Sequence, residues 1–377
     1  MIFVKSRHGS DIFPAPPTSR ERRAFRRHLA AGAKIIALYA GAVIGAGFAS
    51  GQEILQFFAL FGRAGIWGAA LVGLLFAYLG AVVLGTATGV HSTSYRGIIS
   101  RLLGPYLGTV VDLLSICVLF GGLAVMLAGS GAVARQQFGL HPVWGVLGLA
   151  LLTSLVVSRG LEGVVEVNAV IVPVKVAIVS VISLWVLFPG ASLPVGAVPD
   201  PAAGNWGVAA LLYVSYNLII PVAVLASVGR YTPRAAGMAG AAAGGLLLGG
   251  LAALMAAALA RYVPQVAAAQ VPLLYMANLI HPALARVAAA VIWLAIFTTA
   301  VAEAHGLAAR MAPPGTRRYC LCGIGAVLCA APAAALGFPE LVGIFYPLFG
   351  YAGLLLMVPL AFTPFAGIWR KTKKHVR

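Results

Sequence analysis

Ten long apolar stretches, separated by short polar or Pro/Gly-containing breaks, constrain the fold of this chain more than any other feature. A membrane-spanning helix needs roughly 20 apolar residues, and the ten stretches take up nearly all of the 377 residues. Hydrophobic residues make up 61% of the sequence and charged residues 9%, a composition that soluble domains do not have. The sequence therefore predicts an all-α polytopic membrane protein without a soluble catalytic domain. The spans are expected at residues 33–61, 64–88, 106–134, 141–158, 163–188, 206–229, 235–260, 285–305, 319–337 and 341–368.

Basic residues flank these spans and set the expected orientation. The chain has 26 Lys and Arg against 9 Asp and Glu, and eight of the basic residues lie in the first 34 while five lie in the terminal "WRKTKKHVR". With the N-terminus inside, 21 basic residues fall on inner segments and four on outer ones, as the positive-inside rule requires. The charge therefore indicates contact with a lipid bilayer rather than with nucleic acid. It predicts cytoplasmic tails at residues 1–32 and 369–377 around a transmembrane domain at 33–368.

The spans divide into two halves of five, at about 33–188 and 206–368, joined by a Pro/Gly-rich outer loop. Five spans in each half give the halves opposite orientations, which is the arrangement of inverted-repeat transporters. The first span, "LYAGAVIGAGFASGQEILQFF", is interrupted by glycines. The sixth contains "LLYVSYN" followed by Pro221, and a proline within a helix removes a backbone donor. Two helices broken near the bilayer midplane predict a small-molecule binding site between them. The short apolar segment "VPLLYMANLIHP" is expected to form an outer-surface helix that caps the bundle.

The "GAG" sequence in the first span is the most specific candidate for ligand binding. Unwinding there frees N–H groups at the start of a half-helix, whose dipole favours an anion such as a substrate carboxylate. Alternatively, the glycines only allow close helix packing. The tyrosines of the sixth span are expected to face the ligand or to pack. The predicted substrate site consists of Gly45, Ala46, Gly47, Tyr213, Ser215, Tyr216 and Asn217.

The stretches "AGAVIGAGFASGQE" and "LLYVSYN" resemble the YkvI-like bacterial membrane proteins. These are similar to the amino acid/polyamine/organocation (APC) superfamily with its LeuT-type five-plus-five fold. The resemblance extends from about Ala33 to Phe365. It implies an alternating-access transporter in the bacterial inner membrane, with substrate bound at unwound segments of the first and sixth spans.

The same resemblance implies a cation site. In sodium-coupled members of this fold, a cation lies between carbonyls of the first span and hydroxyls of the eighth. The matching positions are Gly41, Ile44, Ala295, Thr298 and Thr299, and sodium is the metal that such a set would hold. The alternative is that the threonines bond to their own helix.

Lys175, deep in the fifth span, competes with this assignment. An ionisable residue at that depth is a functional candidate, and some proton-coupled relatives place a fifth-span lysine where sodium would bind. Lys175 is therefore expected to carry the coupling proton, to pair with Glu53 or Asp112, or to coexist with sodium. Glu53 is expected to gate the outer vestibule, to bind a substrate amine, to carry a proton, or to make a structural hydrogen bond.

The remaining acids are expected near the cytoplasmic ends of their spans. Asp112, Glu166 and Glu303 could pair there with Arg96, Arg101 or Arg159 as an inner gate, with a structural role favoured.

These observations predict a cation-coupled secondary transporter (a symporter) of an amino acid or related small amine or carboxylate. No catalytic residue and no cofactor other than the coupling ion, Na⁺ or H⁺, are expected. A non-transporting membrane receptor for a small nutrient is the main alternative. An intramembrane enzyme is disfavoured because the sequence has no paired-aspartate metal motif.

Overall fold

The protein is a helical bundle in which ten apolar helical segments match the ten predicted spans. The computed structural model describes residues 19–89, 95–159, 164–188 and 204–374, and contains no β-strand within them. Eight described helices are long and apolar enough to cross a membrane, and two shorter apolar helices, His28–Val43 and Ile171–Leu187, complete the set. The prediction of an all-α polytopic membrane protein is confirmed.

The first half of the chain contains one interrupted span and four continuous ones. Its elements are α1 (Ser19–Val43), α2 (Ala46–Ser50), α3 (Gln52–Phe57), the 3₁₀ helix η1 (Ala59–Phe61), α4 (Arg63–Gly89), α5 (Tyr95–Phe138), α6 (Pro142–Arg159) and α7 (Val164–Leu187). Because α1 begins at Ser19, helix extends into the segment that was predicted to be a tail at residues 1–32.

The second half begins at α8 and ends with the longest helix of this half. Its elements are α8 (Trp206–Val228), η2 (Gly229–Tyr231), α9 (Arg234–Ala260), α10 (Val263–Ala267), α11 (Pro272–Ile280), α12 (Pro282–Met311), α13 (Arg317–Ala330), η3 (Ala331–Leu336) and α14 (Phe338–Lys374). The last helix runs past residue 368, where the C-terminal tail was expected to begin.

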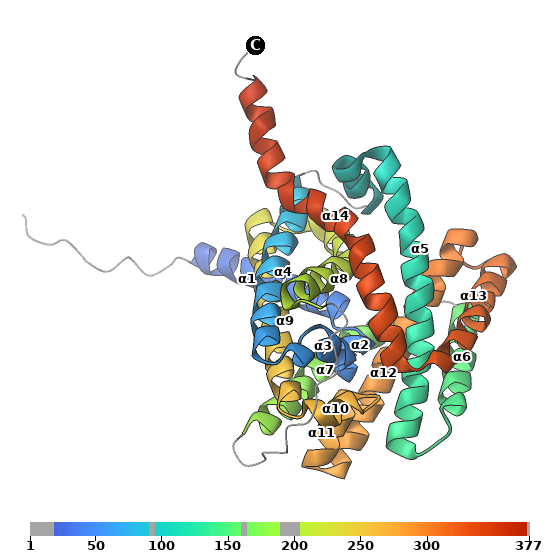
Figure 1. Cartoon of the computed structure of the whole chain (residues 1–377). Coiled ribbons are helices and arrows are strands. Elements are labelled where there is room, and N and C mark those ends of the chain that lie inside the picture. Colours follow the sequence, from blue (N-terminus) through green and yellow to red (C-terminus); the bar gives the residue numbers. More distant parts are fainter. Residues whose placement is uncertain (1–18, 90–94, 160–163, 189–203, 375–377) are drawn as a thin grey trace, which may run out of the picture.

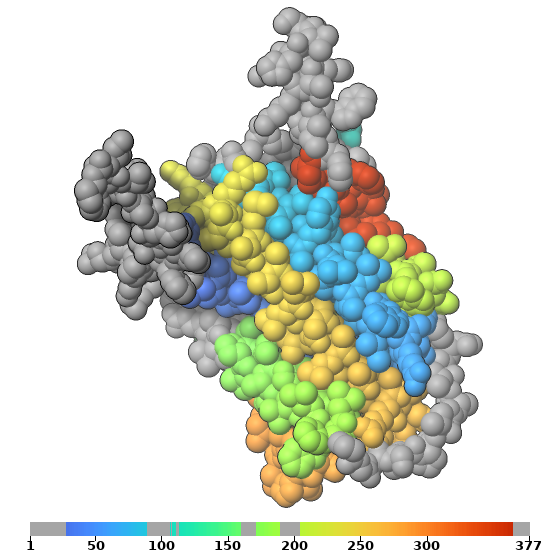
Figure 2. Space-filling view, turned by 90° about the vertical axis from the view of Figure 1, so that its left-hand side faces the viewer, coloured from blue at the N-terminus to red at the C-terminus, as the bar shows by residue number. Residues whose placement is uncertain are grey.

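Small residues let the two halves pack closely. On the face seen in Figure 2, α9 runs diagonally between α4 and α1. A Cβ atom at Gly73 of α4 would lie only 3.1 Å from the Cα atom of Gly249 on α9, so the two backbones are in direct contact there. On the other side, α14 packs against α8 and α5 (Figure 1).

The predicted capping helix is present as α11. It lies with α10 at the end of the molecule opposite the C-terminus (Figure 1), and it packs against α12, α7 and α2. The apolar residues Leu273, Leu274, Met276 and Ala277 are fully buried, while the side chain of His281 caps the next helix by accepting from Ala283 N–H at 3.1 Å. The helix therefore covers the interrupted first span at the end of the bundle opposite the C-terminus.

Candidate functional site

The first span is interrupted where its glycines predict. Helix α1 ends at Val43 and α2 begins at Ala46, so Ile44 and Gly45 form the unwound link. The predicted unwound segment, Gly45 to Gly47, is displaced by about one residue, since Gly47 lies inside α2. The first hydrogen bond of α2 runs from Ala49 N–H to Gly45 O at 3.0 Å. The N–H groups of Ala46, Gly47 and Phe48 therefore have no acceptor within the helix, as in the first turn of any helix.

A second bend follows at Gly51, whose φ of 84° separates α2 from α3. This left-handed conformation favours glycine. The Ser50 hydroxyl donates to Gly47 O at 2.8 Å and accepts from Gln52 N–H at 3.3 Å, which satisfies polar groups exposed by the bend. Because the chain turns here, Glu53 on α3 is brought back against α2.

The sixth span is not interrupted, which corrects the prediction for this helix. Helix α8 is continuous from Trp206 to Val228 with Pro221 inside it. Hydrogen bonds to the bundle stabilise the helical conformation of α8. The Ser215 hydroxyl lies within donating distance of Gly350 O on α14, at 2.6 Å, and of Leu212 O in its own helix, at 2.9 Å. The Asn217 amide donates to Tyr213 O at 3.1 Å. Ser215 and Asn217 therefore bond within the bundle, and the proline removes one donor without unwinding the helix.

Glu53 occupies the position predicted for a substrate carboxylate. Its side chain is 4% exposed, and it accepts a hydrogen bond from the Tyr216 hydroxyl at 2.5 Å. The N–H of Phe48, in the first turn of α2, also lies close to this carboxylate. A Cβ atom at Gly47 would overlap the Glu53 Oε1 atom. The glycine is therefore needed so that a carboxylate of the protein itself can reach the start of the half-helix.

An aromatic cluster from α8, α14 and α3 surrounds this carboxylate. The ring centroids of Tyr213 and Tyr216 are 5.5 Å apart, those of Tyr216 and Tyr346 are 5.0 Å apart, and Phe57 lies 5.5 Å from Tyr213. The hydroxyls of Tyr213 and Tyr346 also approach Glu53. The Tyr213 hydroxyl is buried but makes no hydrogen bond of ordinary geometry among the described residues. The structure thus places the two predicted tyrosines beside Glu53, which was not among the substrate-site residues predicted from the sequence.

Lys175 takes the position predicted for a cation. Its side chain is 2% exposed, and its Nζ atom donates to Ile44 O at 2.7 Å. The Lys175 amine does not pair with Glu53: its hydrogen bond goes to Ile44 O, whereas Glu53 accepts from the Tyr216 hydroxyl. The side chain of Asp112, the other predicted partner, lies outside the described residues.

The predicted threonine ligands make hydrogen bonds within their own helix. The hydroxyls of Thr298 and Thr299 both donate to Ala295 O, at 3.1 and 2.8 Å, which is the local bonding that threonines commonly make in helices. Gly41 packs on α7, where its Cβ position would be 3.3 Å from Val172 Cγ2. Within the described residues there is no group of three or more His, Cys, Asp or Glu side chains that could hold a metal. Of the predicted cation ligands, Ile44 O thus accepts from the Lys175 amine, and the two threonine hydroxyls direct their protons at their own helix.

A second acid faces the interior and was missed as a site residue. The Glu303 Oε2 atom is buried without a hydrogen-bond partner in the described part of the chain. Its carboxylate lies over Gly122 on α5, and it interacts electrostatically with Tyr346. No contact between Glu303 and Arg159 is present, while Glu166, Arg96 and Arg101 lie outside the residues with described side chains. The signal available in the sequence was spacing, since Glu303 follows Thr299 by four residues and so shares its helix face.

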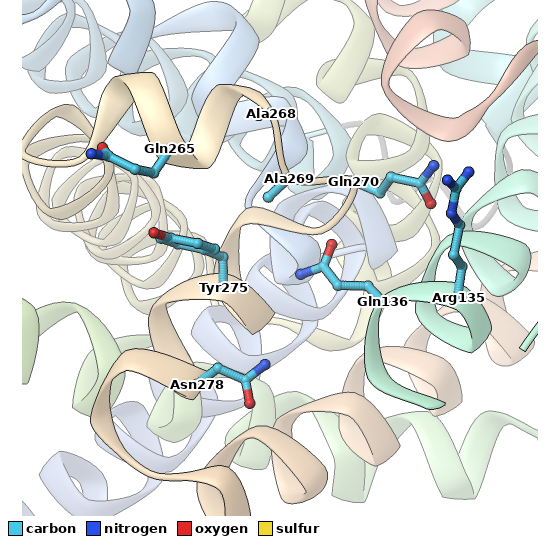
Figure 3. A pocket seen from close by; sticks show the side chains of 8 residues that line it. All are labelled: Arg135, Gln136, Gln265, Ala268, Ala269, Gln270, Tyr275 and Asn278. Carbon is cyan, nitrogen blue, oxygen red and sulfur yellow. The ribbon is translucent and has the colours of Figure 1, made fainter. Parts of the chain in front are cut away.

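A cavity of about 500 Å³ opens between α5, α10 and α11, at the end of the molecule opposite the C-terminus (Figure 3). Two hydrogen bonds frame it, since the Gln136 side chain donates to Val271 O at 2.9 Å and accepts from Val271 N–H at 2.8 Å. These bonds fasten the start of α11 to the end of α5. The cavity is lined by Arg135, Gln136, Gln265, Ala268, Ala269, Gln270, Tyr275 and Asn278.

Solved structures with the same fold define the class of this protein. The structure of MhsT in complex with L-phenylalanine matches with a TM-score of 0.57 and 15% identity, covering 87% of this chain and 95% of that one. The inward-facing conformation of Mhp1 matches with a TM-score of 0.58 and 13% identity, covering 88% of this chain and 76% of that one. The protein is therefore a multi-pass membrane protein with the LeuT-type fold, as its sequence predicts.

Sequence comparison then identifies the family. No protein-family model matches the chain. It is 31% identical over 343 residues to the uncharacterized protein YyaD of Bacillus subtilis (strain 168), covering 90% of this chain and 99% of YyaD. It is also 27% identical over 320 residues to the uncharacterized membrane protein YkvI of the same organism, covering 84% of this chain and 91% of YkvI. The chain belongs to the YkvI-like family of membrane proteins that includes YyaD.

Proposed function

We propose that this protein is a proton-coupled secondary transporter of an amino acid or a related small amine or carboxylate. The observation that carries the proposal is the hydrogen bond of 2.7 Å from Lys175 Nζ to Ile44 O. In sodium-coupled members of the fold, the carbonyl at this position is a metal ligand. A tethered amine in the same place can gain and lose a proton, whereas a bound metal ion must enter and leave.

The location of the amine supports a role in coupling. Lys175 lies on α7, and its acceptor is the carbonyl at the broken end of α1, where the helix dipole favours a positive charge. Loss of the proton from the amine would weaken this contact between the two helices. Protonation is thereby linked to the geometry of the first span, at which the substrate is proposed to bind.

The fold supports transport as the activity, with Mhp1 described as a nucleobase-cation-symport-1 family transporter. The charge distribution supports placement in the bacterial inner membrane with both termini in the cytoplasm. A membrane receptor with the same fold would bind ligand without accumulating it. Uptake measurements separate the two functions.

The test is uptake of radiolabelled amino acids and amines into proteoliposomes under two separate gradients. We expect an inward proton gradient at equal sodium on both sides to stimulate uptake, and a sodium gradient at equal pH to have no effect. The Lys175→Ala variant should lose the stimulation, while Lys34→Ala should retain it, because Lys34 is exposed on α1. Stimulation by sodium alone, or unchanged proton stimulation in Lys175→Ala, would refute proton coupling through this amine.

A further inference from the structure

We infer that the buried carboxylate of Glu53 and the tyrosines around it bind a small organic cation, a protonated amine that needs no carboxylate of its own. This inference rests on the proposed function, because it names the substrate class of the transport site. It is argued from three features of the described residues: the occupied end of α2, the cluster of tyrosines, and the acids that face the interior.

The end of α2 has no room for a second carboxylate. The Phe48 N–H lies close to the Glu53 carboxylate, and the space over Gly47 is filled by the Glu53 Oε1 atom. A substrate carboxylate would have to displace this side chain or lie against it, and two like charges in a low-dielectric interior repel strongly. The position that would recognise the carboxylate of an amino acid is therefore closed by the protein.

The surroundings of Glu53 suit an ammonium group. Tyrosine rings attract cations that lie within about 6 Å of the ring centre, and Tyr213, Tyr216 and Tyr346 are mutual neighbours with centroid spacings of 5.5 and 5.0 Å. The Tyr213 side chain is 0% exposed, and its hydroxyl oxygen has no hydrogen-bond partner among the described residues. The Tyr213 hydroxyl lies close to the same carboxylate, and its oxygen has lone pairs that can accept from the N–H groups of an ammonium ligand.

The interior of the bundle holds more acids than amines. Among the described side chains, Glu53 and the buried end of Glu303 face the interior, against one buried amine, that of Lys175. Burial favours the uncharged form of an acid that has no partner of opposite charge. A protonated amine that binds beside Glu53 would supply such a partner and favour the carboxylate form.

The first test compares three ligands that share the same branched side chain: an amine, an amino acid and a carboxylate. Thermal stabilisation of the purified full-length protein is measured with 3-methylbutylamine, leucine and 4-methylpentanoate, and then with 1,4-diaminobutane, 2-phenylethylamine and choline. We expect at least one of the amines to raise the melting temperature at concentrations at which leucine and 4-methylpentanoate do not. Stabilisation by leucine without stabilisation by any amine would overturn the inference, and so would the absence of any shift with the whole amine series.

Two pairs of variants then locate the binding site. Glu53→Gln should weaken amine binding about tenfold to a hundredfold, the usual effect of losing a hydrogen bond to a charged group. Glu340→Gln makes the same change at an exposed glutamate on α14 and should have no effect. If Glu53→Gln fails to fold, Tyr346→Phe provides the second pair, with Tyr351→Phe as its control because Tyr351 is 58% exposed on the same helix.

The outcomes separate this inference from the proposed function. Equal amine binding by Glu53→Gln and wild type, or by Tyr346→Phe and Tyr351→Phe, would overturn the inference and leave transport untouched. Amine binding that depends on Glu53, without uptake under any ion gradient, would refute the transporter and support the receptor while the substrate class stands. Proton-driven uptake of leucine, with no binding of amines, would support the transporter and refute the substrate class.

Discussion

Replacing Gly47 by alanine tests the placement of Glu53 most directly, because the neighbouring Gly45 provides a matched control. A Cβ atom at Gly47 would lie 2.7 Å from the Cδ atom and 2.8 Å from the Cγ atom of Glu53. A Cβ atom at Gly45 would find its nearest neighbour, Val43 O, at 4.0 Å. The Gly45 backbone has φ −80° and ψ −169°, a conformation open to alanine.

The expected difference follows from the hydrogen bond that Glu53 would lose. Since the added methyl group overlaps both the carboxylate and its Cγ atom, the whole side chain must move away from the Tyr216 hydroxyl. A hydrogen bond to a charged group contributes about 1.5 to 3 kcal/mol, so Gly47→Ala should destabilise the protein by about that amount. Gly45→Ala should change stability by less than about 1 kcal/mol.

The assay is unfolding in detergent followed by tryptophan fluorescence, read alongside ligand binding. A double-mutant cycle tests whether the loss of stability in Gly47→Ala acts through Glu53. In a Glu53→Ala background, Gly47→Ala should change stability little, because the side chain that it displaces is absent. The coupling energy between the two sites should therefore be close to the whole effect. Equal stabilities of Gly47→Ala and Gly45→Ala, or no coupling to Glu53, would refute the reasoning.

Two further changes test other parts of the structure. The double variant Thr298→Val/Thr299→Val should retain proton-stimulated uptake in proteoliposomes, because both hydroxyls bond only to their own helix; loss of that uptake would show that they take part in coupling. Gln136→Leu should remove two hydrogen bonds to Val271, worth about 1 kcal/mol each. Hydrogen exchange of the Val271 amide should become faster, and an unchanged rate would mean that these bonds do not hold α11 in place.

The interruption of the first span could be predicted because its cause is local. Glycine weakens a helix by about 1 kcal/mol relative to alanine, and the effect adds up where glycines lie close together. The sixth span could not be predicted in this way. Its proline and polar residues suggested a break, but Ser215 bonds to Gly350 on α14, far away in sequence. Whether a weak helix opens depends on such contacts, which a single sequence does not display.

The partners of the charged residues in the site could not be predicted from the sequence either. The depth of Lys175 and Glu53 in the membrane was enough to mark them as unusual, and their competing roles could be enumerated. Their partners could not be chosen, because each partner depends on the path of another helix. Glu53 reaches Phe48 only because Gly51 bends the chain at φ 84°, and Lys175 reaches Ile44 only because α7 packs beside α1.

The interrupted first span contacts the proposed sites of both ligands, the coupling proton on Lys175 and the organic cation at Glu53. The broken end of α1 carries a partial negative charge and is met by the Lys175 amine, and the start of α2 carries a partial positive charge and is met by the Glu53 carboxylate. Each side chain is held on a different element from the helix end that it binds. Loss of a proton from Lys175 would therefore change the contact at the end of α1, and binding of a cation at Glu53 would change the contact at the start of α2. The two contacts flank the same two-residue link, Ile44 and Gly45. Because coupling between two sites is reciprocal, a ligand at one end must alter binding at the other whenever the link moves.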